Sequence, residues 1–197
     1  MTPLPSAFLG PPLAHRGLHD LQDARPENSR PAVRAAVAAG YGIEIDVQPS
    51  ADGVAMVFHD DTLDRLTAAA GPIRSRPAAE LSRLPLCGSA ATIPTLAQVL
   101  ADIAGRVPLL VEIKDQDGAF GPDVGPLERA VAGALEDYRG PVAVMARNPC
   151  SVAAMAAAAP GLPRGLVTCA WRPEEWPGVP PGRLAILRDI TETLRLG

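Results

Sequence analysis

The stretch IEIDV, residues 43–47, decides how the fold of this chain is to be interpreted. Ile43, Ile45 and Val47 are β-branched and suit a buried strand. Glu44 and Asp46 alternate with them, so on a strand both carboxylates project from one face, roughly 6.6 Å apart along the strand. Burying an unpaired carboxylate is very costly. The pattern therefore predicts that a positive charge lies between Glu44 and Asp46.

Short apolar runs alternate with helical patterns along the chain, which is typical of an α/β protein with a parallel sheet. The runs at 43–47, 54–58 and 108–113 are almost entirely apolar, so we expect both faces of the sheet to be covered. Polar residues break in late in the strands, which favours a TIM-type barrel over a Rossmann fold, since no G-x-G-x-x-G follows the first strand. The expected strands are 13–16, 43–48, 54–59, 108–114, 142–146 and 165–170, and the expected helices are 29–39, 78–84, 95–104, 126–138, 151–159 and 182–196.

The composition predicts one globular domain over residues 1–197. Hydrophobic residues make up 47% of the chain and the net charge is -4, so we expect no nucleic-acid surface. No apolar run approaches the roughly 20 residues of a membrane span, and the N-terminus lacks the basic residues of a secretory signal. Cys87, Cys150 and Cys169 are widely spaced and odd in number, which predicts reduced thiols and a cytoplasmic location rather than a disulfide framework or a zinc site.

Charged side chains gather at the ends of four expected strands: His15 and Arg16, then Glu44 and Asp46, then His59 and Asp60, and finally Glu112 and Lys114. In a barrel these ends meet at one mouth. The carboxylates of Glu44, Asp46 and Glu112 suit a hard divalent cation, Mg²⁺ or Ca²⁺, whereas zinc more usually recruits His or Cys. The alternative is that Arg16 and Lys114 simply neutralise the three carboxylates in an ion cluster.

A divalent cation beside Arg16 and Lys114 would make a strongly positive pocket. The ligand that such a pocket favours is a phosphate ester, because these positive charges offset the negative charge that develops on phosphoryl oxygens. His15 and His59 titrate near neutrality, so one can serve as general base and the other as general acid, in an order that the sequence leaves open. We therefore expect a small-molecule phosphodiester as the substrate.

The sequence resembles the glycerophosphodiester phosphodiesterase family in five motifs, which run in order over residues 14–114. They are His-Arg-Gly in AHRGLHD, Pro-Glu-Asn in RPENS, Glu-x-Asp and a His-Asp pair in AGYGIEIDVQPSADGVAMVFHDDTLDR, and Glu-x-Lys in LLVEIK. The resemblance implies a TIM barrel that hydrolyses diesters such as glycerophosphocholine to glycerol 3-phosphate and an alcohol. By position, it implies the following roles: an acid/base pair of His15 and His59, metal ligands Glu44, Asp46 and Glu112, and phosphate contacts Arg16 and Lys114.

The residues around these motifs are expected to support the site. Within Pro-Glu-Asn, we expect Glu27 and Asn28 to be mainly structural, with Asn28 near a helix N-terminus and Glu27 able to line the mouth. Asp60 and Asp61 are expected to hold His59 in place. Trp171 and Trp176 either wall a ligand or pack a proline-rich loop, and packing is the expectation.

The sequence also departs from the family pattern. A complete barrel has eight strands and typically about 250 residues, but only six strands are expected here, so we expect a barrel truncated at its C-terminus with the first and sixth strands unpaired at their edges. Arg147 stands where the resemblance suggests an aromatic residue. The alternatives are an inactive fragment that at most binds metal and phosphodiester, and a lipid phosphodiesterase, which is disfavoured because no membrane-binding amphipathic helix stands out. The alcohol, the choice of cation and the oligomeric state stay open.

Overall fold

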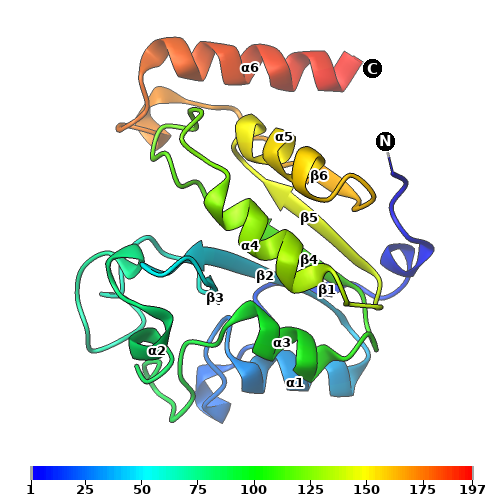
Figure 1. Ribbon diagram of the computed structural model, residues 1–197, viewed down its shortest axis with the longest axis vertical. Coiled ribbons are helices and arrows are strands. Elements are labelled where there is room, and N and C mark those ends of the chain that lie inside the picture. Colours follow the sequence, from blue (N-terminus) through cyan, green and yellow to red (C-terminus); the bar gives the residue numbers. More distant parts are fainter. Residues whose placement is uncertain (1, 197) are drawn as a thin grey trace.

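The computed structural model describes residues 2–196, with side chains described up to Leu194, and it is built on one six-stranded sheet (Figure 1). The strands are β1 (Leu13–Ala14), β2 (Gly42–Pro49), β3 (Ala55–Val57), β4 (Leu109–Ile113), β5 (Val142–Ala146) and β6 (Arg164–Leu166). The main path runs β1-β2-β4-β5-β6, and every pairing along it is parallel. The predicted parallel α/β sheet is therefore confirmed.

The third strand does not belong to this parallel path. β3 pairs with β2 in the antiparallel sense, with Val47 opposite Val57, so six strands are present as expected but the expectation that the third one is parallel is wrong. The reason is the short connection between them, because a parallel partner needs a crossover of a dozen or more residues. Instead the chain turns at Gly53, whose φ is 79°, and Ser50 Oγ accepts a hydrogen bond from the Val54 amide. The reversal places the segment after β3 beside the C-terminal end of β2.

Four helices cover one face of the sheet. They are α1 (Arg30–Ala39), α3 (Leu96–Ile103), α4 (Pro126–Leu135) and α5 (Pro149–Ala158), and Figure 1 shows them stacked along the strands. Alternate strand residues pack with them in one core, for example Ile43 and Ile45 from β2 against Val33 of α1. Since side chains alternate along a strand, Glu44 and Asp46 of β2 necessarily occupy the opposite face.

The helix ends are set by local chemistry. Ser29, rather than Asn28, caps α1 by accepting a hydrogen bond from the Ala32 amide, and Gly40 ends the helix with a φ of 74°. Thr95 and Gln98 form a reciprocal capping box at the start of α3. These signals at the helix ends determine where each helix begins or ends relative to the neighbouring strands.

Two smaller units flank the sheet. The segment after β3, which contains α2 (Ala78–Leu81), has its own apolar cluster around Phe58. α6 (Pro181–Leu196) packs through Leu184 and Leu187 onto Trp171 and Phe120, away from the main core. Within residues 2–196, β1 and β6 each pair with one neighbour only, as predicted. None of the described helices has both the length and the hydrophobicity that a membrane crossing requires.

Candidate active site

Three carboxylates meet on the face of the sheet that the helices leave free. Glu44 and Asp46 stand on β2, and Glu112 on β4 lies directly opposite Asp46 in the strand register. One oxygen from each lies within 4.8 Å of the other two. Their exposed fractions are only 5%, 1% and 7%. The sequence prediction that these residues converge is confirmed, and strand register is what brings them together.

The cations predicted beside this cluster compensate two of the three carboxylates. Lys114 Nζ lies 2.6 Å from Asp46 Oδ1 and 3.1 Å from Glu112 Oε1. Arg16 Nε lies 3.4 Å from Asp46 Oδ2. The ion-cluster alternative thus describes Asp46 and Glu112 well, because each has a cationic partner at close range.

Glu44 is left without such a partner. Burial, followed by the nearby charge of Asp46, raises the pKa of Glu44 to about 7. Its Oε1 is buried and has no hydrogen-bond partner within the described residues. A buried acceptor of this kind requires a partner, and a divalent cation prefers a set of carboxylate oxygens such as this. The donor set therefore fits a hard cation better than a closed ion cluster.

A strained turn joins the N-terminal motif to the cluster. Arg16 and Gly17 adopt φ values of 57° and 79°, which directs the Arg16 amide toward Glu44 Oε2 at 3.0 Å. A Cβ at position 17 would lie 3.0 Å from the backbone carbon of Ala32, so glycine is needed there for space as well as conformation.

Asn28 has a role that the sequence did not suggest. Its side chain donates to Asp46 Oδ2 at 2.8 Å and accepts from the Asp46 amide at 3.2 Å. It is 1% exposed and has a φ of 56°. Asn28 therefore orients a carboxylate of the cluster instead of capping a helix, and its position next to Glu27 in the Pro-Glu-Asn motif was the available signal.

His59 and Asp60 form a pair at the end of β3. His59 Nδ1 lies 2.6 Å from Asp60 Oδ1, and Gln48 Nε2 donates to the His59 carbonyl oxygen at 3.2 Å. Hydrogen bonds from Arg65 lower the pKa of Asp60 to about 2, so Asp60 is ionised and can only accept. Nδ1 must then carry the proton, which leaves Nε2 of a neutral ring free to accept one. The prediction that Asp60 holds His59 in place is confirmed. Asp61 instead accepts at 2.9 Å from Gln48 Nε2, the group that also donates to the His59 carbonyl oxygen.

His15 lies at the edge of the cluster. Its Nε2 is 3.9 Å from Glu44 Oε2, and its side chain is 69% exposed. Burial and then the charge of Arg16 lower the pKa of His15, which favours the neutral ring near pH 7. His59 lines the cavity described next, whereas His15 does not.

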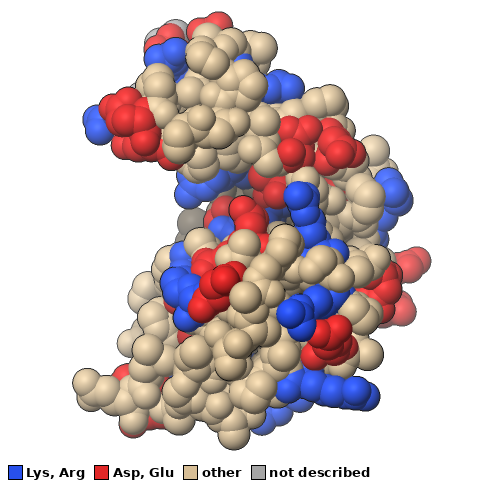
Figure 2. Space-filling view, turned by 90° about the vertical axis from the view of Figure 1, so that its left-hand side faces the viewer, with Lys and Arg blue, Asp and Glu red and all other residues tan. Residues whose placement is uncertain are grey.

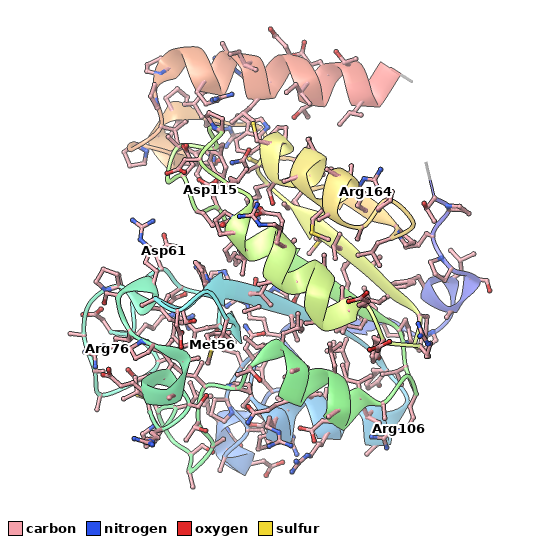
Figure 3. All side chains as sticks on the ribbon, in the orientation of Figure 1. Met56, Asp61, Arg76, Arg106, Asp115 and Arg164 are labelled. Atoms are coloured by element: carbon pink, nitrogen blue, oxygen red, sulfur yellow. The ribbon has the colours of Figure 1, made fainter. Side chains whose placement is uncertain are left out.

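A cavity of about 740 Å³ opens beside the cluster. Its lining includes Glu112, Lys114, His59, Arg147 and Trp176. Arg147 Nε lies 3.7 Å from Glu112 Oε1, and its guanidinium carbon lies 5.8 Å from the centre of the Trp176 ring. Figure 2 shows acidic and basic residues gathered around a notch in the face of the molecule that it presents. In Figure 3, Asp61 and Asp115 approach this gap from opposite sides.

The two tryptophans differ. Trp171 is fully buried and packs against Phe120, with the two ring centres 5.3 Å apart, as expected for a residue with a packing role. Trp176 packs in the same cluster, with its ring centre 5.1 Å from that of Phe120, but it also lines the cavity, so it is positioned to contact a ligand.

The fold and this site define a class: an α/β protein with three clustered, buried carboxylates, two adjoining cations and a cavity that Glu112, Lys114 and His59 line. The chain belongs to the glycerophosphoryl diester phosphodiesterase family, whose model matches residues 15–177.

Individual relatives support this assignment. A glycerophosphodiester phosphodiesterase of Caldanaerobacter subterraneus subsp. tengcongensis is 35% identical over 115 residues, which are 54% of this chain and 45% of the relative. A phosphodiesterase of Oleispira antarctica, solved in complex with its product sn-glycerol-3-phosphate, is 29% identical with a TM-score of 0.72, over 92% of this chain and 73% of that one. The chain thus spans about half the length of the curated relatives it matches, and the structural likeness confirms the predicted barrel-type α/β class.

Proposed function

We propose that this protein hydrolyses glycerophosphodiesters to glycerol 3-phosphate and an alcohol, with the help of a divalent cation. The observation that carries the proposal is the buried cluster of Glu44, Asp46 and Glu112, in which one oxygen has no hydrogen-bond partner among the described residues. Glu112 also lines the cavity, together with His59 and Lys114. Family membership supports the same reaction class. The Oleispira relative, which was solved with sn-glycerol-3-phosphate, supports this product.

Glu44, Asp46 and Glu112 would hold the cation, Mg²⁺ or Ca²⁺. When bound, it would act as a Lewis acid that offsets charge on the phosphoryl oxygens. Lys114 and Arg16 would bind the remaining phosphate oxygens. Both lie against Asp46 and are therefore next to the cation that the cluster would hold. The buried carboxylates would keep these two cations from moving away from the phosphate.

His59 and His15 would manage the protons. An attacking oxygen forms a bond to phosphorus while the bond from phosphorus to the alcohol oxygen breaks. One imidazole takes the proton of the attacking oxygen and the other gives a proton to the departing alcohol. The free Nε2 of His59 supports its part in this exchange, and the lowered pKa of His15 makes that ring available as a base near pH 7.

A substrate panel tests the proposal directly. Glycerophosphodiesters with different alcohols are supplied one at a time with Mg²⁺ or Ca²⁺, and glycerol 3-phosphate is measured. We expect release that stops with a chelator and falls 10²- to 10⁴-fold in His59→Ala, the usual contribution of a general acid or base. His19→Gln, which changes an exposed loop histidine, is the control and should stay within about twofold. Cation binding without turnover on any diester would instead support a binding-only protein.

We also propose a cytoplasmic location. All three cysteines are free within the described structure, and reduced thiols are usual in that compartment. Fractionation of the native host cells would test this.

A further inference from the structure

Arg65 links two carboxylates in the segment that follows β3. Its guanidinium donates to Asp60 through Nε at 2.6 Å and Nη2 at 2.8 Å. It also donates to Glu27 through Nη2 at 2.7 Å and Nη1 at 3.1 Å. One side chain therefore makes two two-point contacts, and it joins loops that are 38 residues apart in sequence.

Each of these carboxylates holds a residue of the candidate site. Asp60 accepts from His59 Nδ1, and Glu27 Oε1 accepts from Arg16 Nη1 at 2.8 Å. Arg65 is thus one residue removed from both the acid/base imidazole and a phosphate-binding guanidinium. Its described hydrogen bonds all go to these two carboxylates, so any influence on the reaction passes through them.

This bridge differs from an ordinary surface ion pair. Exposed pairs contribute little because two long side chains must be ordered in water. Here the side chains of Glu27 and Asp60 are only 14% and 21% exposed, although Arg65 itself is 49% exposed. Planar two-point contacts give direction as well as attraction, and lysine does not reproduce them because its ammonium is a point charge.

The bridge also keeps both carboxylates ionised. Burial acts to raise the pKa of Glu27, but the hydrogen bond from Arg65 and the charge of Arg16 outweigh it, and the net shift is downward. Asp60 is held ionised in the same way. Both can therefore act only as acceptors, which fixes the direction of the hydrogen bonds from His59 and Arg16.

We propose that Arg65 is a positioning residue that sets the tautomer of His59 through Asp60 and the orientation of Arg16 through Glu27. In the absence of Arg65, Asp60 and Glu27 turn toward solvent, His59 populates the tautomer with the proton on Nε2, and Arg16 loses its fixed direction. The kinetic part of this inference rests on the proposed function. The tautomer part does not.

Imidazole ¹⁵N NMR of the full chain tests the tautomer without substrate, and the three histidines make assignment simple. We expect the wild type to show His59 protonated on Nδ1, and Arg65→Met to shift its signals toward the Nε2–H form. Arg65→Lys should lie between them. Arg34→Met is the matched control, since Arg34 makes a surface contact at 2.9 Å with Asp102, a residue outside this network. A thermal melt accompanies each variant, so that misfolding is recognised.

Kinetics provide the second readout. We expect kcat/KM to fall roughly 10- to 100-fold in Arg65→Met, the loss typical of removing an outer partner of a site residue. Asp60→Asn should reduce mainly kcat and Glu27→Gln should raise mainly KM. Combining Arg65→Met with either should cost less than the sum of the single losses, because the same contact is removed twice.

The results separate the two proposals. If Arg65→Met and Asp60→Asn leave the ¹⁵N signals of His59 unchanged while only the melting temperature falls, Arg65 is a structural residue and the inference is overturned. If the wild type hydrolyses no diester but the tautomer shifts as expected, the positioning role stands and the proposed function fails.

Discussion

The two halves of the candidate site are built differently. The acidic cluster stands on β2 and β4, where strand register alone places Asp46 opposite Glu112. The histidine half stands on the loop after β3, where side-chain contacts from Gln48 and Asp60 hold His59, and Arg65 in turn holds Asp60. On strands the backbone ladder sets the geometry at no further cost. On loops the geometry must be assembled from hydrogen bonds that can be removed one at a time.

This difference has a consequence for how mutations act. A change in the strand half should remove a function outright, because no other residue occupies that position in the register. A change in the loop half should weaken function in steps, because several contacts share the work. The predictions below test this contrast, beginning with the largest effect.

Glu44→Gln should remove cation binding and turnover, with activity falling by three orders of magnitude or more, yet it should stabilise the cation-free protein. Glu44 is 5% exposed, and its charge lies beside those of Asp46 and Glu112. Removing a buried charge that has no Lys or Arg side chain at close range relieves a cost on the order of 1–2 kcal/mol. Urea unfolding at about pH 8, with and without Mg²⁺ or Ca²⁺, measures both effects.

The matched control for that experiment is Glu80→Gln, an exposed carboxylate paired with Arg76. It should leave cation binding unchanged. A Glu44→Gln protein that gains as much stability from the cation as the wild type would contradict the assignment of Glu44 as a cation ligand.

Asn28 tests the junction between the two halves through a pair of variants. Asn28→Gly loses the hydrogen bonds to Asp46 but tolerates the left-handed φ of 56° without strain. Asn28→Ala loses the same hydrogen bonds, and its Cβ makes that φ strained. We expect Asn28→Gly to cost about 1–3 kcal/mol through unsatisfied buried groups and Asn28→Ala to cost roughly 1–2 kcal/mol more through backbone strain. Chemical denaturation measures this difference. Equal losses in the two variants would mean that the conformation of residue 28 carries no strain.

The contrast between the halves also explains what could be predicted from sequence. Alternation along a strand, in which every second side chain lies on the same face, was enough to find Glu44, Asp46, Glu112 and Lys114. The direction of β3 was missed because its apolar run resembles that of a parallel strand, and only the short turn at Ser50–Gly53 indicates the reversal. Asn28 and Arg65 were not recognised because their contacts join segments far apart in sequence. Such pairings leave no periodic signal.

Acid titration separates the loop half from the rest of the fold. Hydrogen bonds from Arg65 lower the pKa of Asp60 from its ordinary 3.8 to about 2. The stability that this carboxylate contributes is therefore fully present above pH 3.8 and is lost as the pH falls toward 2. Near pH 6 we expect the free energy of unfolding of the wild type to exceed that of Asp60→Asn by on the order of 1 kcal/mol. The difference is no larger because the pair of Asp60 and Arg65 is partly exposed to solvent.

Denaturation at several values between about pH 6 and 2.5 measures this gap, which should close as the pH falls. Asp137→Asn serves as the control because the Asp137 side chain is 98% exposed, and its gap to wild type should be small and flat. A gap for Asp60→Asn that widens in acid would contradict the assignment of Asp60 as an ionised acceptor.

The smallest effect is expected at Arg147, on the cavity wall. Arg147 Nε lies 3.7 Å from Glu112 Oε1, which Lys114 already contacts at 3.1 Å. A second positive charge there opposes binding of a divalent cation, and the Arg147 side chain is 35% exposed, so solvent weakens the effect. Arg147→Leu should therefore tighten cation binding about two- to fivefold, equivalent to about 0.4–1 kcal/mol. Arg172→Leu removes the same charge at the rim, where Arg172 pairs with Glu175 at 3.6 Å, and isothermal titration should show almost no change for it. Weaker binding in Arg147→Leu would instead mean that the guanidinium holds Glu112 in place, so that this loop residue completes the strand-borne cluster rather than competing with its cation.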